Sequence, residues 1–453
     1  MIYQAETGNA RMLLCGETML ARGLTPFKEP DYLALLELTR NADVAFTNLE
    51  TTVRNRDEGY ATATKGTPMT TPPELLEDLK WMGFNLVSTS NNHALDYGPG
   101  GVLAMCKHLQ NARLAYSGSG ANLGESRMPG YVDTAAGRVG LVSATSTFKP
   151  GERAGEQRPD TYGRPGCNPL RYTSNYTIDG PAFDELMRIS DRLAFSTDMK
   201  RLRASFYSAS EAPEDSAEAT TFLGNNFKRG KEFKISTTVD PSDAEANLRA
   251  IREAKRQADW VIFSFHNHEY GEEGRRERPN RVDLEIPADF MIEFSRAAID
   301  AGADAVVGHG PHVTLGIEIY KNRPIFYSLG NHIFQNDSVE VFPSEAYTRF
   351  GLGHEATPAD FLDARNGNGT RSFPAFKEYW ESYAAMCEFR GRELVGIRLH
   401  PVDLGHRRSR AQMGRPVIAR GEVAASVLDR VTRFSRHFGT EIVTEGESGY
   451  IRL

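Results

Sequence analysis

The sequence has few cysteines and no long apolar run, and each shortage excludes a class of protein. Its four cysteines are scattered and none forms a CxxC pair, which argues against a disulfide framework and against a structural zinc site built on thiolates. No apolar stretch approaches the roughly 20 residues that span a bilayer, and the N-terminus lacks the pattern of a signal peptide. We therefore expect a cytoplasmic protein without a membrane span.

An excess of basic charge is also missing. Lysine and arginine number 53 against 60 aspartates and glutamates, for a net charge of −7. Nucleic-acid binding usually needs a basic face, so we expect no nucleic-acid partner. A length of 453 residues with 40% hydrophobic content fits one large globular domain with insertions, or two to three domains. The partner that we expect is a small-molecule or peptide substrate.

What the sequence does contain is an alternation of short apolar strands and amphipathic helices, which predicts an α/β fold. Strands are expected at 11–15, 44–46, 84–87, 139–142, 260–265 and 303–307, with helices at 31–40, 72–82, 101–110, 243–257 and 287–301. A hairpin follows at 314–329. Near the C-terminus, 373–386 looks helical, 386–389 and 394–399 read as a hairpin, and a helix at 422–438 precedes a last strand.

Residues of metal-ligand type follow five of these strands. They are Glu17, Glu50, Asn92, His266, His309 and His312. In α/β sheets, ligands gather beyond the carboxyl ends of strands. Carboxylates, an amide and imidazoles suit a divalent manganese, iron or zinc ion, or two ions sharing a carboxylate. Each residue alone is more often a cap or a turn residue, so the joint pattern carries the prediction. The three-residue spacing of His309 and His312 would point two nitrogens at one metal.

The loop after the third strand adds a candidate for proton transfer. His93 directly follows Asn92, and Asp96 lies three residues further on. An imidazole beside a metal site can serve as a general acid, and a carboxylate next to it can orient the ring. We therefore predict His93 as a catalytic residue and Asp96 as the residue that positions it.

Two long irregular segments interrupt the alternation and set the expected domain organisation. The core would comprise 1–147 and 241–334, with the metal-binding histidines in the second part. An inserted cap or lid would occupy 148–240, because structureless loops of that length are unusual in a compact domain. A second insertion would occupy 335–385, and 386–453 would return to the core as a hairpin, a helix and a strand.

These motifs resemble the CapA or PgsA family, the poly-gamma-glutamate capsule biosynthesis proteins, which are related to the calcineurin-like metallophosphoesterases. The matching stretches are LLCGETMLARG, ADVAFTNLETTV, GFNLVSTSNNHALDYGPGGV, AYSGSGANL, SFHNHEYGEE, GADAVVGHGPHVTLGIEIYKNRPIFYSLGNHIF and VGIRLHPVDL. The resemblance implies a four-layer αββα sandwich, metallophosphoesterase-like, with two long insertions. It also implies a central or bridging role for Glu50, metal ligation by Asn92 and the histidines, and His93 as the catalytic imidazole.

The chain departs from that family pattern at four places. Glu17 replaces the usual aspartate, and Met19 stands where the related phosphoesterases carry a histidine, which puts a complete two-metal site in question. His268 and His332 occupy positions where the family has glycine and phenylalanine, and either could be an additional acid or base. In addition, capsule proteins of this type are typically anchored to a membrane and face outward, and no anchor is expected here.

Three functions follow as hypotheses. The first is a metal-dependent hydrolase, in which metal-activated water attacks an amide, ester or phosphoester and His93 protonates the leaving group. The second is a peptide or amino-acid epimerase or isomerase, with His93 paired with His268 or His332 as the two bases. The third is a non-catalytic component of poly-gamma-glutamate or capsule synthesis.

Overall fold

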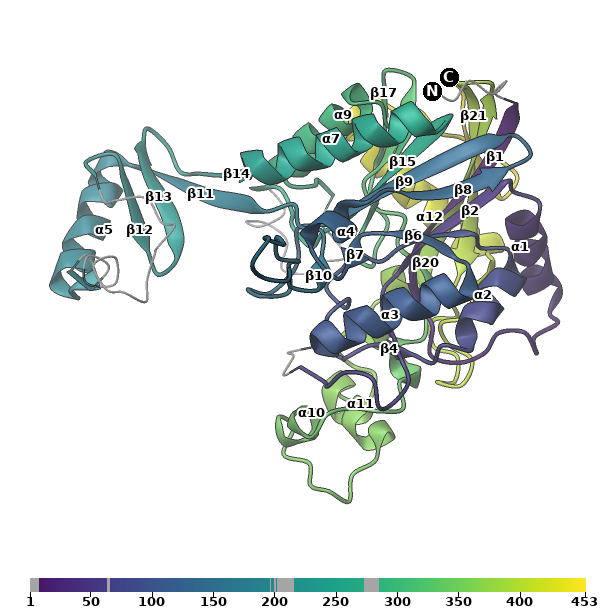
Figure 1. Cartoon of the computed structure of the whole chain (residues 1–453), viewed down its shortest axis with the longest axis horizontal. Helices are drawn as coiled ribbons and strands as arrows, with labels where there is room; N and C mark the ends of the chain where they lie inside the picture. The colour runs from purple at the N-terminus through teal and green to yellow at the C-terminus, as the bar shows by residue number, and fades with distance from the viewer. Residues whose placement is uncertain (1–7, 63–65, 196, 199–200, 202–215, 273–284) are drawn as a thin grey trace.

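Two large β-sheets and the helices that cover them make up the body of the molecule, which confirms the predicted α/β class (Figure 1). The computed structural model describes residues 8–62, 66–195, 197–198, 201, 216–272 and 285–453. Among these residues, no helix combines the length and the apolar character that crossing a bilayer requires.

The first sheet is built around the N-terminal strand. β1 (Asn9–Met19), β2 (Val44–Leu49), β5 (Leu86–Ser88) and β6 (Ala115–Ser117) run parallel in that order, and β19 (Asn331–Phe334) pairs in parallel with the end of β1. On the other side of β1 lie antiparallel strands from the C-terminal part of the chain. These are β20 (Glu381–Arg390), β21 (Glu393–Asp403), β22 (Val417–Ile418), β24 (Ser448–Ile451) and β23 (Val443–Glu445).

The second sheet has six strands. Their order is β17 (Ile317–Tyr320), β18 (Arg323–Phe326), β16 (Ala305–His309), β15 (Trp260–His266), β9 (Gly137–Thr145) and β8 (Gly130–Thr134). β9, β15 and β16 are parallel neighbours, whereas β17 and β18 form the predicted hairpin. Because parallel neighbours end at the same edge, the end of β15 lies beside the end of β16, with His266 paired to His309.

Both sheets are buried on both faces, and the alternation along each strand divides the core into layers. Met12 and Leu14 of β1 share a hydrophobic cluster with Ile262 of the second sheet. Their neighbours Leu13 and Cys15 face the opposite way, toward a second cluster. That cluster includes α1 (Pro30–Arg40), α2 (Leu75–Met82) and α3 (Gly98–Ala112). Cys15 is fully buried, as its place in an apolar strand predicts.

A third cluster lies on the other side of the second sheet. α7 (Pro241–Gln257) and α9 (Asp289–Asp300) pack their apolar residues against Val261, Phe263 and Phe265 of β15. α7 begins where Asp240 accepts hydrogen bonds from the backbone N–H groups of residues 242 and 243, with Pro241 at the first helical position, a favourable helix start. α12 (Gly421–Ser435) contributes to the cluster between the sheets.

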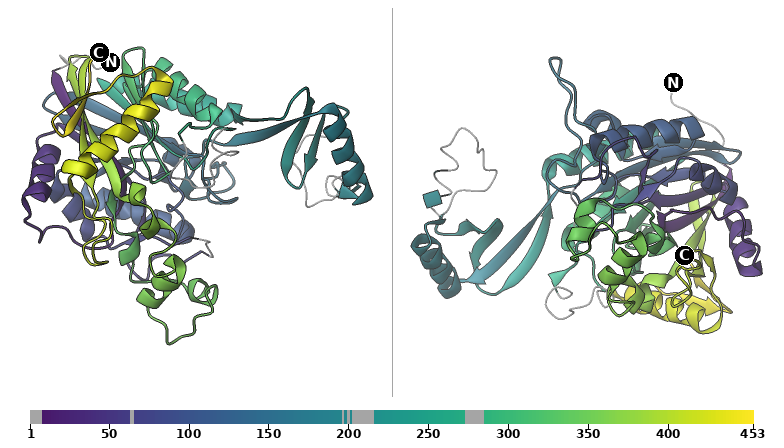
Figure 2. Two further views of the ribbon diagram at one scale, coloured as in Figure 1. Left: turned by 180° about the vertical axis from the view of Figure 1, so that it is seen from behind. Right: turned by 90° about the horizontal axis from the view of Figure 1, so that it is seen from below.

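The segment 148–240 contains an arm that projects from the body (Figures 1 and 2). Its four-stranded sheet comprises β11 (Tyr172–Asp179), β12 (Ala219–Phe222), β13 (Asn225–Gly230) and β14 (Lys234–Val239), and it carries α5 (Gly180–Arg192). The base of the arm is fixed to α9, where Tyr172 stacks on Phe290 with ring centroids 4.6 Å apart.

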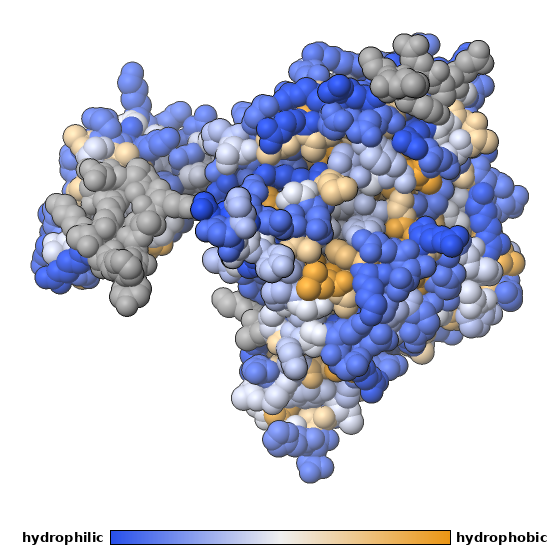
Figure 3. Space-filling view, viewed as in Figure 1, coloured by the Kyte–Doolittle hydropathy of each residue, from blue (hydrophilic) through white to orange (hydrophobic). Residues whose placement is uncertain are grey.

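The face of the molecule in Figure 3 is largely hydrophilic, with apolar residues in small groups.

Part of the same segment returns to the body. β10 (Gly166–Cys167) pairs with β7 (Ser119–Gly120), next to α4 (Leu123–Arg127). A separate short pair joins β3 (Thr52–Val53) to β4 (Thr70–Thr71).

The segment 335–385 contains α10 (Ser344–Thr348) and α11 (Pro358–Asn366), which lie below the body in Figure 1. Three short 3-10 turns, at 336–338, 373–375 and 377–380, occur in this segment, and a fourth follows α12 at 436–438.

The prediction of a helix at 373–386 is wrong. Two 3-10 turns occupy Phe373–Ala375 and Lys377–Trp380, and β20 begins at Glu381. The predicted end of the second insertion at 385 thus falls inside a strand that pairs with β1 along Asn9–Leu14. The hairpin that β20 forms with β21, and the late helix, are confirmed.

Candidate metal centre

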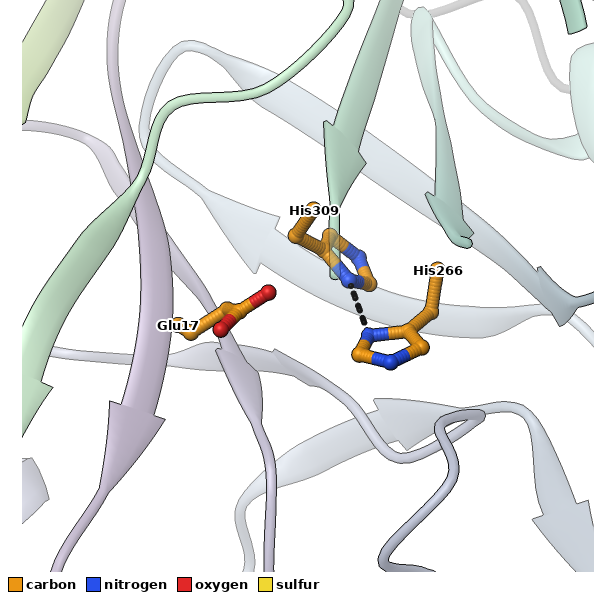
Figure 4. A group of neighbouring side chains, drawn as sticks. All are labelled: Glu17, His266 and His309. Atoms are coloured by element: carbon orange, nitrogen blue, oxygen red, sulfur yellow. Dashed lines mark hydrogen bonds between the residues drawn. The ribbon is translucent and has the colours of Figure 1, made fainter. Parts of the chain in front are cut away.

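The carboxyl ends of parallel strands from the two sheets meet at one place. From the first sheet, Glu17 lies in the last part of β1 and Glu50 directly follows β2. From the second sheet, His266 and His309 are the last residues of β15 and β16. Figure 4 shows the Glu17 carboxylate directed toward the two imidazoles. The strand ends that the sequence singles out are therefore brought together.

The histidine and carboxylate ligand atoms form two groups. Glu17, His266 and His309 make up the first, and Glu50, His268 and His312 the second; within each group the three ligand atoms lie within 4.8 Å of one another. Glu50 also lies close to the first group, with its Oε1 3.7 Å from Nε2 of His266. Within its own group, its Oε2 lies 3.8 Å from Nδ1 of His312. Donor atoms that sit about 2.1 Å from a shared ion lie about 3–4 Å apart, so these spacings suit metal ligands.

Several buried atoms in these groups lack a hydrogen-bond partner among the described residues. Among them are both carboxylate oxygens of Glu50 and Nε2 of His266, and Oδ1 of the adjacent Asn92 is in the same state. Buried polar atoms are nearly always satisfied, because an unpaired one costs about 1–3 kcal/mol. Two carboxylate oxygens, an amide oxygen and an imidazole nitrogen are all electron-pair donors, so a cation satisfies them together. The residues present therefore fit a divalent metal ion.

Neighbouring side chains set the orientation of the imidazole of His309. Its Nε2 lies 2.6 Å from the Ser264 hydroxyl, and its Nδ1 lies 3.0 Å from Nδ1 of His266. With Nε2 held by Ser264, Nδ1 is the nitrogen that remains for a metal. Hydrogen bonds of this kind fix the tautomer of a metal-ligating histidine.

The loop after β16 holds Glu17 and His312. The backbone N–H of Gly310 donates to the Glu17 carboxylate, which also lies in contact with Nδ1 of His312. His312 adopts the left-handed backbone conformation, with φ of 63°, which costs about 1–3 kcal/mol and is typical of functional sites. Asn331 of β19 lies 3.0 Å from the same imidazole through its Oδ1 and donates its amide N–H to the His312 carbonyl.

Burial favours the neutral form of His266 and His309. It lowers the pKa of His309 to about 3, and it lowers the pKa of His266 well below its usual value, with further repulsion from the neighbouring histidines. A neutral imidazole is the form that binds a metal. These two rings therefore carry available lone pairs throughout the neutral pH range.

The pKa values of the Glu17 and Glu50 carboxyl groups shift in opposite directions. Burial and repulsion from Glu17 raise the pKa of Glu50 well above its usual range. For Glu17, burial also acts to raise the pKa, but attraction and a hydrogen bond to His312 outweigh it and lower the pKa to about 2. Two carboxylates this close cannot both be ionised cheaply, so Glu50 is the member of the pair that takes up a proton more readily.

His93 and Asp96 are placed as the sequence predicts, next to the two groups. Nδ1 of His93 lies 2.5 Å from the Asp96 carboxylate, which also accepts a hydrogen bond from the backbone N–H of Met69. The other ring nitrogen, Nε2, lies 3.9 Å from Glu50. Asp96 thus fixes the ring so that Nε2 faces the site.

A cavity of ≈ 370 Å³ opens beside these residues. Asn92, His93, His268 and His312 line it from the core, so the candidate proton-transfer residue His93 faces the same space as two members of the second ligand group. A small molecule or the end of a longer chain can occupy a space of this size, which is near the lower end of ligand pockets.

Three placements differ from the sequence prediction. His309 and His312 belong to different ligand groups, not to one. His268, expected as an additional acid or base, joins the second ligand group from the loop that follows β15. His332 lies apart from both groups: it is buried against Phe84, with ring centroids 5.5 Å apart.

Fold and site together describe an α/β protein with buried carboxylate and imidazole groups that can hold a divalent metal ion. Residues 11–336 match the family model described as bacterial capsule synthesis protein PGA_cap. The chain therefore belongs to this family, as its motifs predict.

The match with relatives extends beyond that region. Two proteins of Sinorhizobium fredii (strain NBRC 101917 / NGR234), described as uncharacterized proteins y4uA and y4sH, are each 32% identical, over 98% of this chain and 93% of their own length. The capsule biosynthesis protein CapA of Bacillus anthracis is 25% identical, over 74% of this chain and 62% of its own.

Proposed function

We propose that this protein is a metal-dependent hydrolase that holds ions in two adjoining positions and cleaves an amide, ester or phosphoester of a small-molecule or peptide substrate. The observation that carries the proposal is the pair of buried ligand groups joined by Glu50 beside an open cavity. Manganese, iron and zinc all suit ligand sets of carboxylate and imidazole.

Each residue has a defined task in this proposal. A divalent ion in such a site supplies Lewis acidity and water of lowered pKa. Glu17, His266 and His309 would hold the first position, and Glu50, His268 and His312 the second, with Asn92 adjacent. His93, fixed by Asp96, presents Nε2 to the cavity and would give its proton to the leaving group, as a general acid within hydrogen-bond reach does.

Metal content measured by elemental analysis tests the proposal directly. Protein purified without chelator or affinity metal is expected to hold close to two ions per chain, with at least one lost in His309→Ala. His108→Ala is the matched control. His108 is a partly buried histidine of α3 that lies outside the ligand groups, and its Nε2 is 2.6 Å from the Glu58 carboxylate. Absence of metal even after it is added back, or a His309→Ala protein that retains both ions, would contradict the proposal.

A screen of amide, ester and phosphoester substrates then tests the reaction. Turnover is expected with the metal-loaded protein, to be abolished by chelation and restored by added metal. His93→Gln is expected to lower the rate by about 10²–10⁴-fold while leaving the metal content unchanged. An equal rate in His93→Gln would remove this residue from the proposed mechanism.

Two other functions each have one supporting observation. His93 and His268 line the same cavity, which favours an epimerase or isomerase; solvent deuterium would then appear at Cα of a peptide substrate without cleavage. Two Mycobacterium tuberculosis relatives, 26% identical, are described as probable polyglutamine synthesis accessory proteins, which favours a non-catalytic role. That role predicts that function in the cell survives His309→Ala.

A further inference from the structure

The cavity beside the ligand groups has a second wall, which comes from the segment 335–385. Arg365, Ser372 and Phe373 line it together with His93, His268 and His312. Arg365 lies near the end of α11, and Phe373 lies in the 3-10 turn that follows. The family match ends at residue 336, so this wall lies outside the region that the family model covers.

Two ring contacts connect Arg365 to the ligand groups. The guanidinium carbon lies 5.7 Å from the centroid of the Phe373 ring. The edge of that ring in turn contacts His312, with centroids 5.3 Å apart, and Phe334 at 5.0 Å. Phe373 therefore fixes the distance between the cation and the second ligand group, and its aromatic surface restricts where the guanidinium can lie.

Arg365 is partly buried and has no ion pair with a described residue. Its Nε donates to the Asn366 amide oxygen at 3.3 Å. The nearest carboxylate that influences it, Asp337, instead accepts hydrogen bonds from the side chains of Asn336 and Asn366. Burial lowers the pKa of Arg365, and Asp337 only partly opposes that effect. A guanidinium has five N–H donors, and most of them remain for a ligand in the cavity.

From this geometry we infer that Arg365 is a substrate-positioning residue that binds an oxyanion group of the substrate, a carboxylate or a phosphate, while the scissile bond lies at the ligand groups. A guanidinium binds either group through two parallel hydrogen bonds. The inference rests on the proposed function for the reacting end of the substrate. It adds the substrate class: a molecule with an anionic group separated from the bond that is cleaved.

Calorimetric titration with two probes tests the inference. Inorganic phosphate and glutarate are titrated into manganese-loaded protein at constant ionic strength, for wild type, Arg365→Gln and Arg365→Lys. Because a hydrogen bond to a charged group is strong, Arg365→Gln is expected to weaken binding of at least one probe by about tenfold or more. Arg365→Lys should recover part of the affinity but not the bidentate geometry.

The control is Arg349→Gln, which changes an exposed arginine of the same segment that does not line the cavity; its affinities should stay within about twofold of wild type. If Arg365→Gln binds only phosphate more weakly than wild type does, Arg365 binds a phosphate group of the substrate. If only glutarate binds more weakly, Arg365 binds a carboxylate. Equal binding of both probes by wild type and Arg365→Gln overturns the inference, as does equal weakening in Arg349→Gln.

The failures of the two proposals can be distinguished. Metal content and unfolding midpoint are measured on the same samples, and the titrations are repeated on metal-free protein. If no metal binds, the hydrolase proposal fails, yet the comparison between wild type and Arg365→Gln still reports on the oxyanion site. A purely structural role for Arg365 would lower the unfolding midpoint while leaving probe affinity unchanged, which would also overturn the inference.

Discussion

At the scale of single residues, His332 is a buried histidine without a hydrogen-bond partner among the described residues. It is 1% exposed, and neither ring nitrogen is satisfied. Its ring packs edge-on against Phe84, and burial lowers its pKa to about 3. The unfolded chain takes up a proton at this residue below its ordinary pKa near 6.5, whereas the folded chain does not. His332 therefore destabilises the fold increasingly as the pH falls from 6.5 toward 3.

Replacing this residue with phenylalanine should remove the pH-dependent penalty. Relative to wild type, His332→Phe is expected to gain about 2 kcal/mol more in unfolding free energy at pH 5.0 than at pH 7.5. Urea denaturation of metal-free protein at both pH values measures this difference, in which constant packing effects cancel. A gain that is the same at both pH values would show that His332 is not held neutral.

At the scale of elements, the turn after β16 depends on Gly310. Its φ is 120°, and a Cβ added there would collide with the Asn267 carbonyl. Gly310→Ala is expected to destabilise the protein by about 2–4 kcal/mol and to weaken metal binding, because the Gly310 N–H holds Glu17. The measurements are the unfolding free energy and the manganese affinity.

Gly353→Ala provides the comparison for that variant. Gly353 lies between α10 and α11, and nothing lies within 4 Å of the place where its Cβ would be. Its substitution should change the free energy of unfolding by less than about 0.5 kcal/mol. Equal effects of the two alanines would contradict the role assigned to the turn.

Local sequence patterns predict the elements that are amphipathic or fully apolar over their whole length. α1 and the β17–β18 hairpin occur where expected, as do the strands that end in His266 and His309. The pattern fails at 373–386, where aromatic residues at helical spacing lie partly in β20. That strand is stabilised by pairing with β1, a partner far away in the sequence, and local periodicity carries no information about such pairing.

The same limit explains which parts of the site the sequence could indicate. Residues at strand ends are recognisable because strand direction alone places them at one edge of a sheet. The division of the histidines into two groups depends on how the two sheets face each other, which no single segment encodes. Arg365 lies in an irregular segment, and only the folded chain shows that it reaches the cavity.

At the scale of the whole molecule, each ligand group takes residues from both sheets. Glu17 lies in β1 and Glu50 directly follows β2 of the first sheet. His266 and His309 end β15 and β16 of the second sheet, and His268 and His312 lie in the loops after those strands. An ion held by these residues would link the sheets, and the folded chain brings its ligands together. Manganese at 1,000 times its dissociation constant is expected to add about 4 kcal/mol to the unfolding free energy, measured by urea denaturation with and without chelator.

The His309→Ala protein serves as the control for that linkage. It should gain less than half of the stabilisation from the same manganese concentration, because the first group keeps only two of its three ligand residues. Equal stabilisation of wild type and His309→Ala would indicate that manganese acts elsewhere on the molecule.

The position of β1 determines when a newly synthesised chain can first hold a metal. Its neighbours in the sheet are β2, β19 and β20, and the last of these ends at Arg390. When the first two-thirds of the chain have been synthesised, Glu17, Glu50 and β2 are present, but His309, His312, β19 and β20 are not. A metal ion held by these two groups would therefore be acquired only after β16 and the loop that follows it have been synthesised.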